Sequence, residues 1–302
     1  MNPPPPTTKA VLRRLLLVMG GVWLLMPLTF VVPWLNSTGP PFFDLTGGFG
    51  VFAHALALSG GGDWAPWIII GLILLVISRP GLSMKQRLLS FLAIGVTLLA
   101  LQGGGAALNE YGLKEVIEEP RPHVKHLAAA AAPSGGSILG MDADAFYDQP
   151  VADRRAHLCA VSGYDDLEPD SPHCRSDAAA PSPRQYCFEE YAHADLHAHP
   201  RVCRHWISTT GGFSFPSGHA YSALFLATFF MGLALSFLTG WRLQFIQFLV
   251  VPWTVLVAYS RVILRVHTPL DITVGGLLGV AFGVAAFVAV RAVLKRIDGD
   301  KT

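Results

Sequence analysis

The stretch Ala220–Leu238 reads AYSALFLATFFMGLALSFL and contains no charged side chain. A run of this length and polarity is what an α-helix needs to cross the roughly 30 Å hydrocarbon core of a bilayer. Lys and Arg are also absent from Leu15–Ser78 and from Leu88–Tyr111. Over all 302 residues the hydrophobic fraction is 52% and the charged fraction 14%, whereas about a quarter of an ordinary soluble domain is charged. The sequence therefore predicts an all-α membrane protein.

Six membrane-spanning helices are predicted from the apolar runs. In chain order they are Leu15–Leu35, Trp64–Ser78, Leu88–Leu108, Ala220–Leu238, Phe245–Tyr259 and Ile272–Val290. The second and fifth are short for a span, so their limits are open: the second could begin within Gly48–Gly62, and Pro252 lies inside the fifth. Arg13 and Arg14 before the first run also fit a signal peptide. That run lacks a clear small-residue cleavage site, which favours a retained helix.

Basic residues set the orientation of the predicted bundle. The six-span layout places most basic residues outside the insert on one side of the membrane. They are Lys9, Arg13, Arg14, Arg79, Lys85, Arg87, Arg242, Arg291, Lys295, Arg296 and Lys301. The first connection on the other side, Asn36–Asp63, has no Lys or Arg. By the positive-inside rule both termini are cytoplasmic, and the long connection Asn109–Gly212 lies outside.

This long connection is the sizeable polar region of the sequence. It holds 16 Asp and Glu against 9 Lys and Arg. It also holds the four cysteines, which are Cys159, Cys174, Cys187 and Cys203. Cysteines confined to a segment that charge bias places outside indicate two disulfides, with three connectivities open. Within it, His126–Ser137 has five consecutive alanines before Pro-Ser-Gly-Gly-Ser, which indicates a flexible linker or a frayed helix. The sequence thus predicts one membrane domain, 1–302, with an extracytoplasmic insert, 109–212, between the third and fourth helices.

Three polar clusters lie at the outer ends of the predicted spans. The stretch 114–122 follows the third helix, 216–219 precedes the fourth, and 260–271 joins the fifth to the sixth. Because these ends share one face of the membrane, the clusters can meet. Taken singly, each has a plain structural explanation: interfacial cations, a helix N-cap at Ser217, a capping arrangement from Thr268 to Asp271, or a structural histidine. Their occurrence together favours a functional site.

The residue types in these clusters suit a phosphate group. Three are cationic donors, and an arginine can bind two phosphate oxygens at once: these are Lys114, Arg121 and Arg261. Ser217 and Gly218 open a helix, so its free backbone N–H groups and its dipole would attract an anion. Two histidines and a carboxylate remain, enough for a nucleophile, an acid and an orienting base. They are His219, His267 and Asp271.

Together the patterns Lys-x6-Arg-Pro, Pro-Ser-Gly-His and Ser-Arg-x5-His-x3-Asp resemble the signature of the type 2 phosphatidic acid phosphatase family. They stand at Lys114 to Pro122, Pro216 to His219 and Ser260 to Asp271, with the spacing intact. Any one pattern is weak, but three blocks in this order between Lys114 and Asp271 are specific. Glu-Glu-Pro-Arg-Pro, His205-Trp206 and Gly-Phe-Ser-Phe-Pro-Ser-Gly-His are most similar to the bacterial phosphatidylglycerophosphatase B branch, which also dephosphorylates undecaprenyl pyrophosphate. The insert is longer than usual for that branch.

This resemblance implies a lipid phosphatase of the bacterial inner membrane with its active site facing the periplasm. His267 would form a phosphohistidine while Asp271 orients its ring, and His219 would protonate the leaving oxygen and then activate water. The charge on the phosphoryl oxygens would be stabilised by Lys114, Arg121, Ser217, Gly218 and Arg261. No metal or cofactor is implied, and the implied partner is a membrane lipid phosphate.

Other functions compete with this one. Within the family, the substrate could instead be lipid A or diacylglycerol pyrophosphate. A lipid transporter or flippase is less well supported, because no predicted span carries a charge near its centre. A non-catalytic lipid-binding member would normally have lost one of His219, His267 and Asp271, and the related haloperoxidases are soluble. The sequence has no basic stripe that would indicate nucleic-acid binding.

Two further patterns have alternatives that the sequence leaves open. His193, Asp195, His197 and His199 could form a metal site, but a His-rich loop without an accompanying Glu base is weak evidence for one. Gly275, Gly279 and Gly283 form a small-residue stripe on the sixth helix, which fits close packing inside the bundle as well as a dimer contact.

Overall fold

The computed structural model describes residues 7–31, 45–61, 70–71, 82–130, 135–162 and 198–299. Every regular element within these ranges is a helix, as predicted. Five helical segments there are long and apolar enough to cross a membrane: Thr8–Val31, Met84–Ala129, Gly218–Phe237, Gly240–Ile263 and Pro269–Ile297. They coincide with five of the six predicted spans. The predicted second span, Trp64–Ser78, lies outside the described residues apart from Ile70 and Gly71, so the six-span count remains a prediction.

The first two described segments differ in length. Helix α1 (Thr8–Leu24) runs through a short turn into α2 (Leu28–Val31). Helix α3 (Gly48–Ser59) has only 12 residues, or about 18 Å at 1.5 Å per residue, which is too short to cross a bilayer. It ends at Ser59, with Gly60 as its C-cap, so a second span that begins as early as Gly48 would be interrupted there. A start near Gly62 leads into residues outside the described part and stays a prediction.

The third span contains two wide turns. Helix α5 (Met84–Leu98) begins at a Ser83 capping box and continues through a π-helical turn, Leu99–Gly103, into α6 (Gly104–Leu108). A second π-helical turn, Asn109–Leu113, leads into α7 (Lys114–Ile117). Each π turn holds an extra residue relative to an α turn and so rotates the face that follows. The segment ends at Glu118, whose φ of 51° leaves the helical region.

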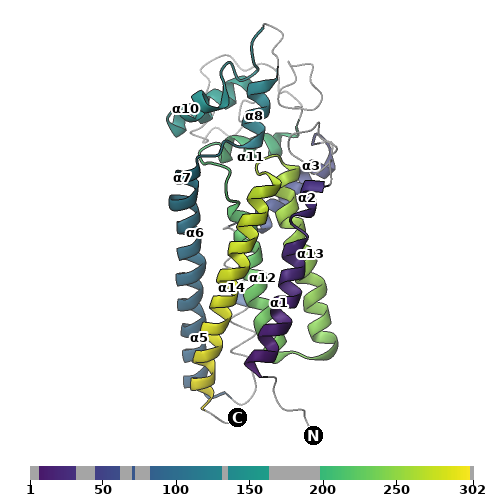
Figure 1. Ribbon diagram of the computed structural model, residues 1–302, viewed down its shortest axis with the longest axis vertical. Coiled ribbons are helices and arrows are strands. Elements are labelled where there is room, and N and C mark those ends of the chain that lie inside the picture. The colour runs from purple at the N-terminus through teal and green to yellow at the C-terminus, as the bar shows by residue number, and fades with distance from the viewer. Residues whose placement is uncertain are drawn as a thin grey trace.

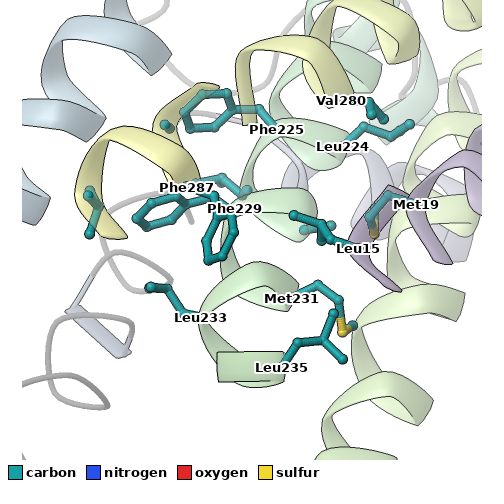
Figure 2. Packing of buried hydrophobic residues seen from close by; sticks show 14 of the residues in the cluster. Leu15, Met19, Leu224, Phe225, Phe229, Met231, Leu233, Leu235, Val280 and Phe287 are labelled. Carbon is teal, nitrogen blue, oxygen red and sulfur yellow. The ribbon is translucent and has the colours of Figure 1, made fainter. Parts of the chain in front are cut away.

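Helix α12 (Gly218–Phe237) forms the centre of the bundle. It packs most extensively along α14 (Pro269–Asp298) and also contacts α13 (Gly240–Ile263) and α1 (Figure 1). Figure 2 shows Phe225 and Phe229 of α12 beside Phe287 of α14, while Leu15 and Met19 of α1 lie on another side. Because α12 is apolar on all sides, only a central position buries it completely.

The glycine stripe on α14 lies against the backbone of α12. A Cβ on Gly275 would lie 2.4 Å from the Ser217 carbonyl oxygen, and a Cβ on Gly279 would lie 2.4 Å from that of Tyr221. A Cβ on Gly283 would lie 2.7 Å from Thr228 Cβ. These distances leave no room for a methyl group. Close packing inside the bundle therefore accounts for the stripe.

Gly279→Ala is expected to destabilise the protein by about 1–3 kcal/mol, because the new methyl group forces two helix backbones apart. The matched control is Gly95→Ala in α5, where a Cβ meets nothing within 4 Å and Ala is the better helix former. Thermal unfolding of both variants in one detergent is the measurement. A Gly279→Ala protein as stable as the Gly95→Ala protein would contradict the packing described here.

The helices nearest the two chain ends lie at the same end of the bundle. Arg291 Nε donates to Thr8 Oγ1 at 3.1 Å, and Gln86 Nε2 donates to the Ile297 carbonyl at 2.9 Å. At the opposite end lie the insert helices, which are α8 (Pro122–Ala129), α9 (Ala143–Tyr147), α10 (Val151–Ser162) and α11 (Pro200–Thr209) (Figure 1). This arrangement agrees with a topology that puts the insert opposite both termini. The sidedness in the membrane still rests on the charge bias.

The insert shares a hydrophobic core with α3 and with the chain that follows α13. Buried side chains from α8 to α11, among them Leu127, Phe146, Leu158 and Trp206, pack together above the bundle. Helix α8 extends to Ala129, so the alanine-rich stretch begins as a helix. Helix α3 joins this end, because His199 N donates to the Leu45 carbonyl at 2.9 Å.

The described cysteines of the insert are Cys159 on α10 and Cys203 on α11. Both are buried, and neither is a free thiol. Cys174 and Cys187 lie outside the described residues. The number of disulfides and their connectivity therefore stay predictions.

The predicted topology has a direct test. Cysteines of the insert should resist a membrane-impermeant thiol reagent in intact cells until a reductant is added, and a reporter fused after Thr302 should report the cytoplasm. A fusion that reports the periplasmic side would overturn the orientation, and with it the outward-facing active site.

Candidate active site

The first turn of α14 fixes the carboxylate of Asp271. Thr268 is the N-cap, Pro269 is the first helical residue and Asp271 is the third, as predicted. Thr268 Oγ1 accepts from Asp271 N at 3.2 Å, and Asp271 Oδ2 accepts from Thr268 N at 2.8 Å. Ser214 Oγ also donates to Asp271 Oδ2. Because these groups hold it, the carboxylate is preorganised.

His267 lies beside this carboxylate. Its Nδ1 is 3.4 Å from Asp271 Oδ2, and the two side chains are 2% and 1% exposed. A carboxylate facing Nδ1 favours the tautomer with the proton on that nitrogen, which leaves the lone pair on Nε2. This is the tautomer that a nucleophilic histidine requires.

Burial lowers the pKa of His267 well below its usual value of 6.5. The positive charges of Arg121, Arg261 and Lys114 lower it further, whereas a hydrogen bond to the Ser214 backbone raises it. A lowered histidine pKa means that the ring stays neutral at neutral pH. His267 therefore keeps its lone pair without needing a base to remove a proton.

The three cations are buried, with exposed fractions of 5% for Lys114, 5% for Arg121 and 1% for Arg261. Arg121 Nε donates to the Gly212 carbonyl at 2.8 Å and Nη1 donates to the Val266 carbonyl at 3.0 Å. Side chains that reach for lipid headgroups would be exposed at their tips. The interfacial-cation explanation therefore does not fit Lys114 and Arg121.

These cations outnumber the carboxylates near them. Lys114 pairs with Glu110, which is half exposed, and Arg121 interacts with Glu110 and Asp271. Buried charges are tolerated when they are paired. With three positive charges against two negative ones, the site retains a net positive charge that suits a phosphate dianion.

The start of α12 supplies backbone donors. Ser217 is its N-cap, as predicted, and Ser217 N donates to the Asp271 carbonyl at 3.0 Å. Gly218 opens the helix, and a Cβ there would lie 3.3 Å from Asn109 Nδ2. An N-terminus of a 20-residue helix attracts anions through its free N–H groups and its dipole.

His219 follows in the first turn of α12. It lies within electrostatic range of His267, Arg261, Arg121 and Lys114. On another side, its Nε2 would be 3.3 Å from a Cβ placed on Gly61. The structure thus brings all eight predicted site residues to the end of the bundle that carries the insert helices: Lys114, Arg121, Ser217, Gly218, His219, Arg261, His267 and Asp271.

Three residues with a place in the site had no predicted role. Ser214 holds Asp271, Glu110 pairs with Lys114, and His205 lies 2.7 Å from Arg261 Nη1. Glu110 had a sequence signal, because it stands four residues before Lys114 on a helix. Ser214 and His205 stand in stretches that carry the family resemblance, but the sequence indicated no role for either, since the partner of each belongs to a distant segment of the chain.

A cavity of about 340 Å³ opens beside Asp271. Its lining residues are Ile117, Glu119, Phe215, Thr268, Leu270 and Asp271. The lining is mostly apolar, and Leu270 is half exposed on α14. The cavity therefore places apolar surface directly next to the charged site.

The possible metal site in the insert lies largely outside the described residues. In the part of the chain that the structure describes, no group of three or more His, Cys, Asp or Glu side chains could hold a metal ion. His193, Asp195 and His197 lie outside that part. His199 caps α11, where its Nδ1 accepts from Arg201 N at 3.2 Å.

A protein-family model described as the PAP2 superfamily matches residues 168–295. The match takes in the second and third polar clusters, from Pro216 to Asp271, but not Lys114 or Arg121. It is a match to the superfamily and does not single out the phosphatidylglycerophosphatase B branch. No curated protein matches the chain. PAP2 superfamily members are phosphatases, which supports a phosphoric ester hydrolase in general.

Proposed function

We propose that this chain is an integral membrane lipid phosphatase that removes the terminal phosphate of a lipid phosphate or pyrophosphate through a phosphohistidine at His267. The observation that carries the proposal is the buried His267–Asp271 pair in a cationic site at one end of an apolar helical bundle. A neutral, oriented imidazole among buried cations suits attack on a phosphate and has little use in a purely structural role.

In the first chemical step, His267 Nε2 attacks phosphorus while the bond from phosphorus to the lipid oxygen breaks. His219 enters this step as the imidazolium, which the negative charge of the bound phosphate favours, and it donates its proton to that oxygen as it leaves. Asp271 stabilises the positive charge that develops on the His267 ring, because its carboxylate faces Nδ1. The products of this step are the dephosphorylated lipid and a phosphorylated His267.

In the second step, water replaces His267 on phosphorus. His219, now neutral, removes a proton from that water and returns to its starting state. Inorganic phosphate leaves, and His267 is regenerated with its proton still on Nδ1. Proton and charge are balanced over the two steps.

Charge on the phosphoryl oxygens is stabilised throughout by fixed positive groups. The guanidinium groups of Arg121 and Arg261 and the ammonium of Lys114 are already buried around the site. Donors that are in place before the reaction need no reorganisation during it. The N–H group of Gly218 and the dipole of α12 add to them, with Ser217 as the N-cap of that helix. These groups do the work that a metal ion does in other phosphoryl-transfer enzymes, so we propose no cofactor.

A lipid substrate is supported by the position of the site. The candidate spans surround α12, and the site lies where they end. The mostly apolar cavity beside Asp271 could take the first carbons of a lipid tail while the phosphate lies among the cations. By resemblance, we propose undecaprenyl pyrophosphate or phosphatidylglycerol phosphate as the substrate, in a bacterial inner membrane with the site facing the periplasm.

The test is phosphate release by purified protein in detergent micelles. Four substrates are compared: undecaprenyl pyrophosphate, phosphatidylglycerol phosphate, phosphatidic acid and lipid A. We expect turnover of at least one of the first two, with kcat/KM higher than for lipid A. Folded protein that releases no phosphate from any of them would refute the proposal. Preference for lipid A would support the proposed phosphatase activity but refute the proposed substrate.

A further inference from the structure

His205 lies on insert helix α11 and reaches the end of α13. Its Nε2 is 2.7 Å from Arg261 Nη1, and the His205 side chain is buried, with 8% exposed. The ring of His54, on α3, contacts it edge to face with ring centroids 5.1 Å apart. Three elements far apart in the sequence thus enclose one guanidinium–imidazole contact.

The contact fixes which nitrogen of His205 carries the proton. A guanidinium can only donate, so Nε2 of His205 must accept and the ring proton must be on Nδ1. Burial lowers the pKa of His205 well below 6.5, and so do the charges that face it: Arg261, His219, His54 and Arg121. The ring is therefore neutral at neutral pH and can hold Arg261 continuously.

The Nε edge of the Arg261 guanidinium is left available. Its Nε is buried and has no hydrogen-bond partner among the described residues. A buried donor without an acceptor is costly, and a phosphoryl oxygen would supply one. Because the guanidinium is planar, a hydrogen bond at Nη1 also sets the direction of its Nε edge.

We propose that His205 is a positioning residue that orients Arg261 for the substrate phosphate. The insert would then complete the active site as well as cover it. This inference rests on the proposed function, since it assumes that Arg261 binds the phosphoryl group. It assigns His205 no contact with the substrate.

The proposal predicts an acid-sensitive phosphate affinity. As pH falls through the lowered pKa of His205, Nε2 gains a proton, the acceptor is lost and two cations face each other. Affinity for the anion should then fall with pH more steeply in wild type than in His205→Gln, whose amide oxygen accepts but does not titrate. His219 and His267 titrate in both proteins, so the comparison isolates the steeper part that His205 adds, including its effect on the neighbouring His219.

The experiment measures inhibition by orthovanadate and KM for the best lipid substrate in His205→Ala, His205→Gln and wild type. His157→Gln is the matched control, because His157 is also an insert histidine with a hydrogen bond, to the Leu139 carbonyl at 2.7 Å. We expect His205→Ala to weaken vanadate inhibition and raise KM by about tenfold, and His205→Gln to stay within about threefold of wild type. The melting temperature without ligand reports folding for each variant.

A double-mutant cycle with Arg261→Ala completes the test. Once Arg261 is absent, removing His205 should have no further effect on vanadate inhibition. The proposal is overturned if His205→Ala matches wild type, if His205→Gln is as impaired as His205→Ala, or if the two losses add. Should folded wild-type protein neither hydrolyse lipid phosphates nor respond to vanadate, the proposed function itself fails, and that result differs from all the others.

Discussion

Purified His267→Ala protein should release no phosphate above background from any lipid phosphate, a loss of roughly 10⁴-fold or more. Without Nε2 no bond from the enzyme to phosphorus can form, so the whole two-step route is closed. Phosphate release is the measurement, with the melting temperature as the check on folding. His157→Gln, which changes a histidine of the insert away from the proposed chemistry, should keep wild-type activity.

The same assay tests the metal-free scheme. Wild-type activity should persist in excess EDTA, and orthovanadate should inhibit competitively because it adopts the five-coordinate geometry of the phosphoryl group in transfer. Loss of all activity on chelation, restored by adding a divalent ion, would refute the scheme. Substantial activity in folded His267→Ala protein would refute the assignment of the nucleophile.

His219→Ala should be impaired to a degree that depends on the leaving group. The variant lacks the proposed acid, so a substrate whose leaving group needs a proton should suffer most. An aryl phosphate, or a pyrophosphate whose leaving group is itself a phosphate, needs less help than an alkyl phosphomonoester. We therefore expect His219→Ala to retain more of its activity on these two than on phosphatidic acid, by about 10²-fold.

The measurement is kcat/KM of each variant on an aryl phosphate and on phosphatidic acid, read as lost transition-state stabilisation. His267→Ala should be equally inactive on both, because it fails before the leaving group matters. If His267→Ala shows the leaving-group dependence and His219→Ala does not, the roles of the two histidines are reversed.

Features set by local chemistry were predictable from the sequence. The capping arrangement at Thr268 and Asp271 and the N-cap at Ser217 follow from neighbouring residue types, and the structure has both. Long uncharged runs determined where five spans lie. The convergence of the three clusters followed from topology alone, because helix ends on one side of a membrane share a face.

Features set by tertiary packing were not predictable. From the sequence, the stripe of Gly275, Gly279 and Gly283 fitted either packing inside the bundle or a dimer contact. The close contact of these glycines with the backbone of α12 distinguishes the two. His205 and Ser214 act through partners that only the fold brings near. The two π turns of the third span were not predicted either, and Lys114, which directly follows the second of them, is buried.

The tight contact between α12 and α14 has a mechanical consequence. Ser217 N is bonded to the Asp271 carbonyl at 3.0 Å, and Gly275 lies against Ser217 with no space between them. These two helices cannot slide or roll past each other. His219 on α12 and Asp271 on α14 therefore belong to one rigid unit. Movements that admit a lipid headgroup must therefore come from the segments around this pair of helices, such as α3 and α5–α7. Clamping those segments together, rather than stiffening α12 and α14, should slow turnover.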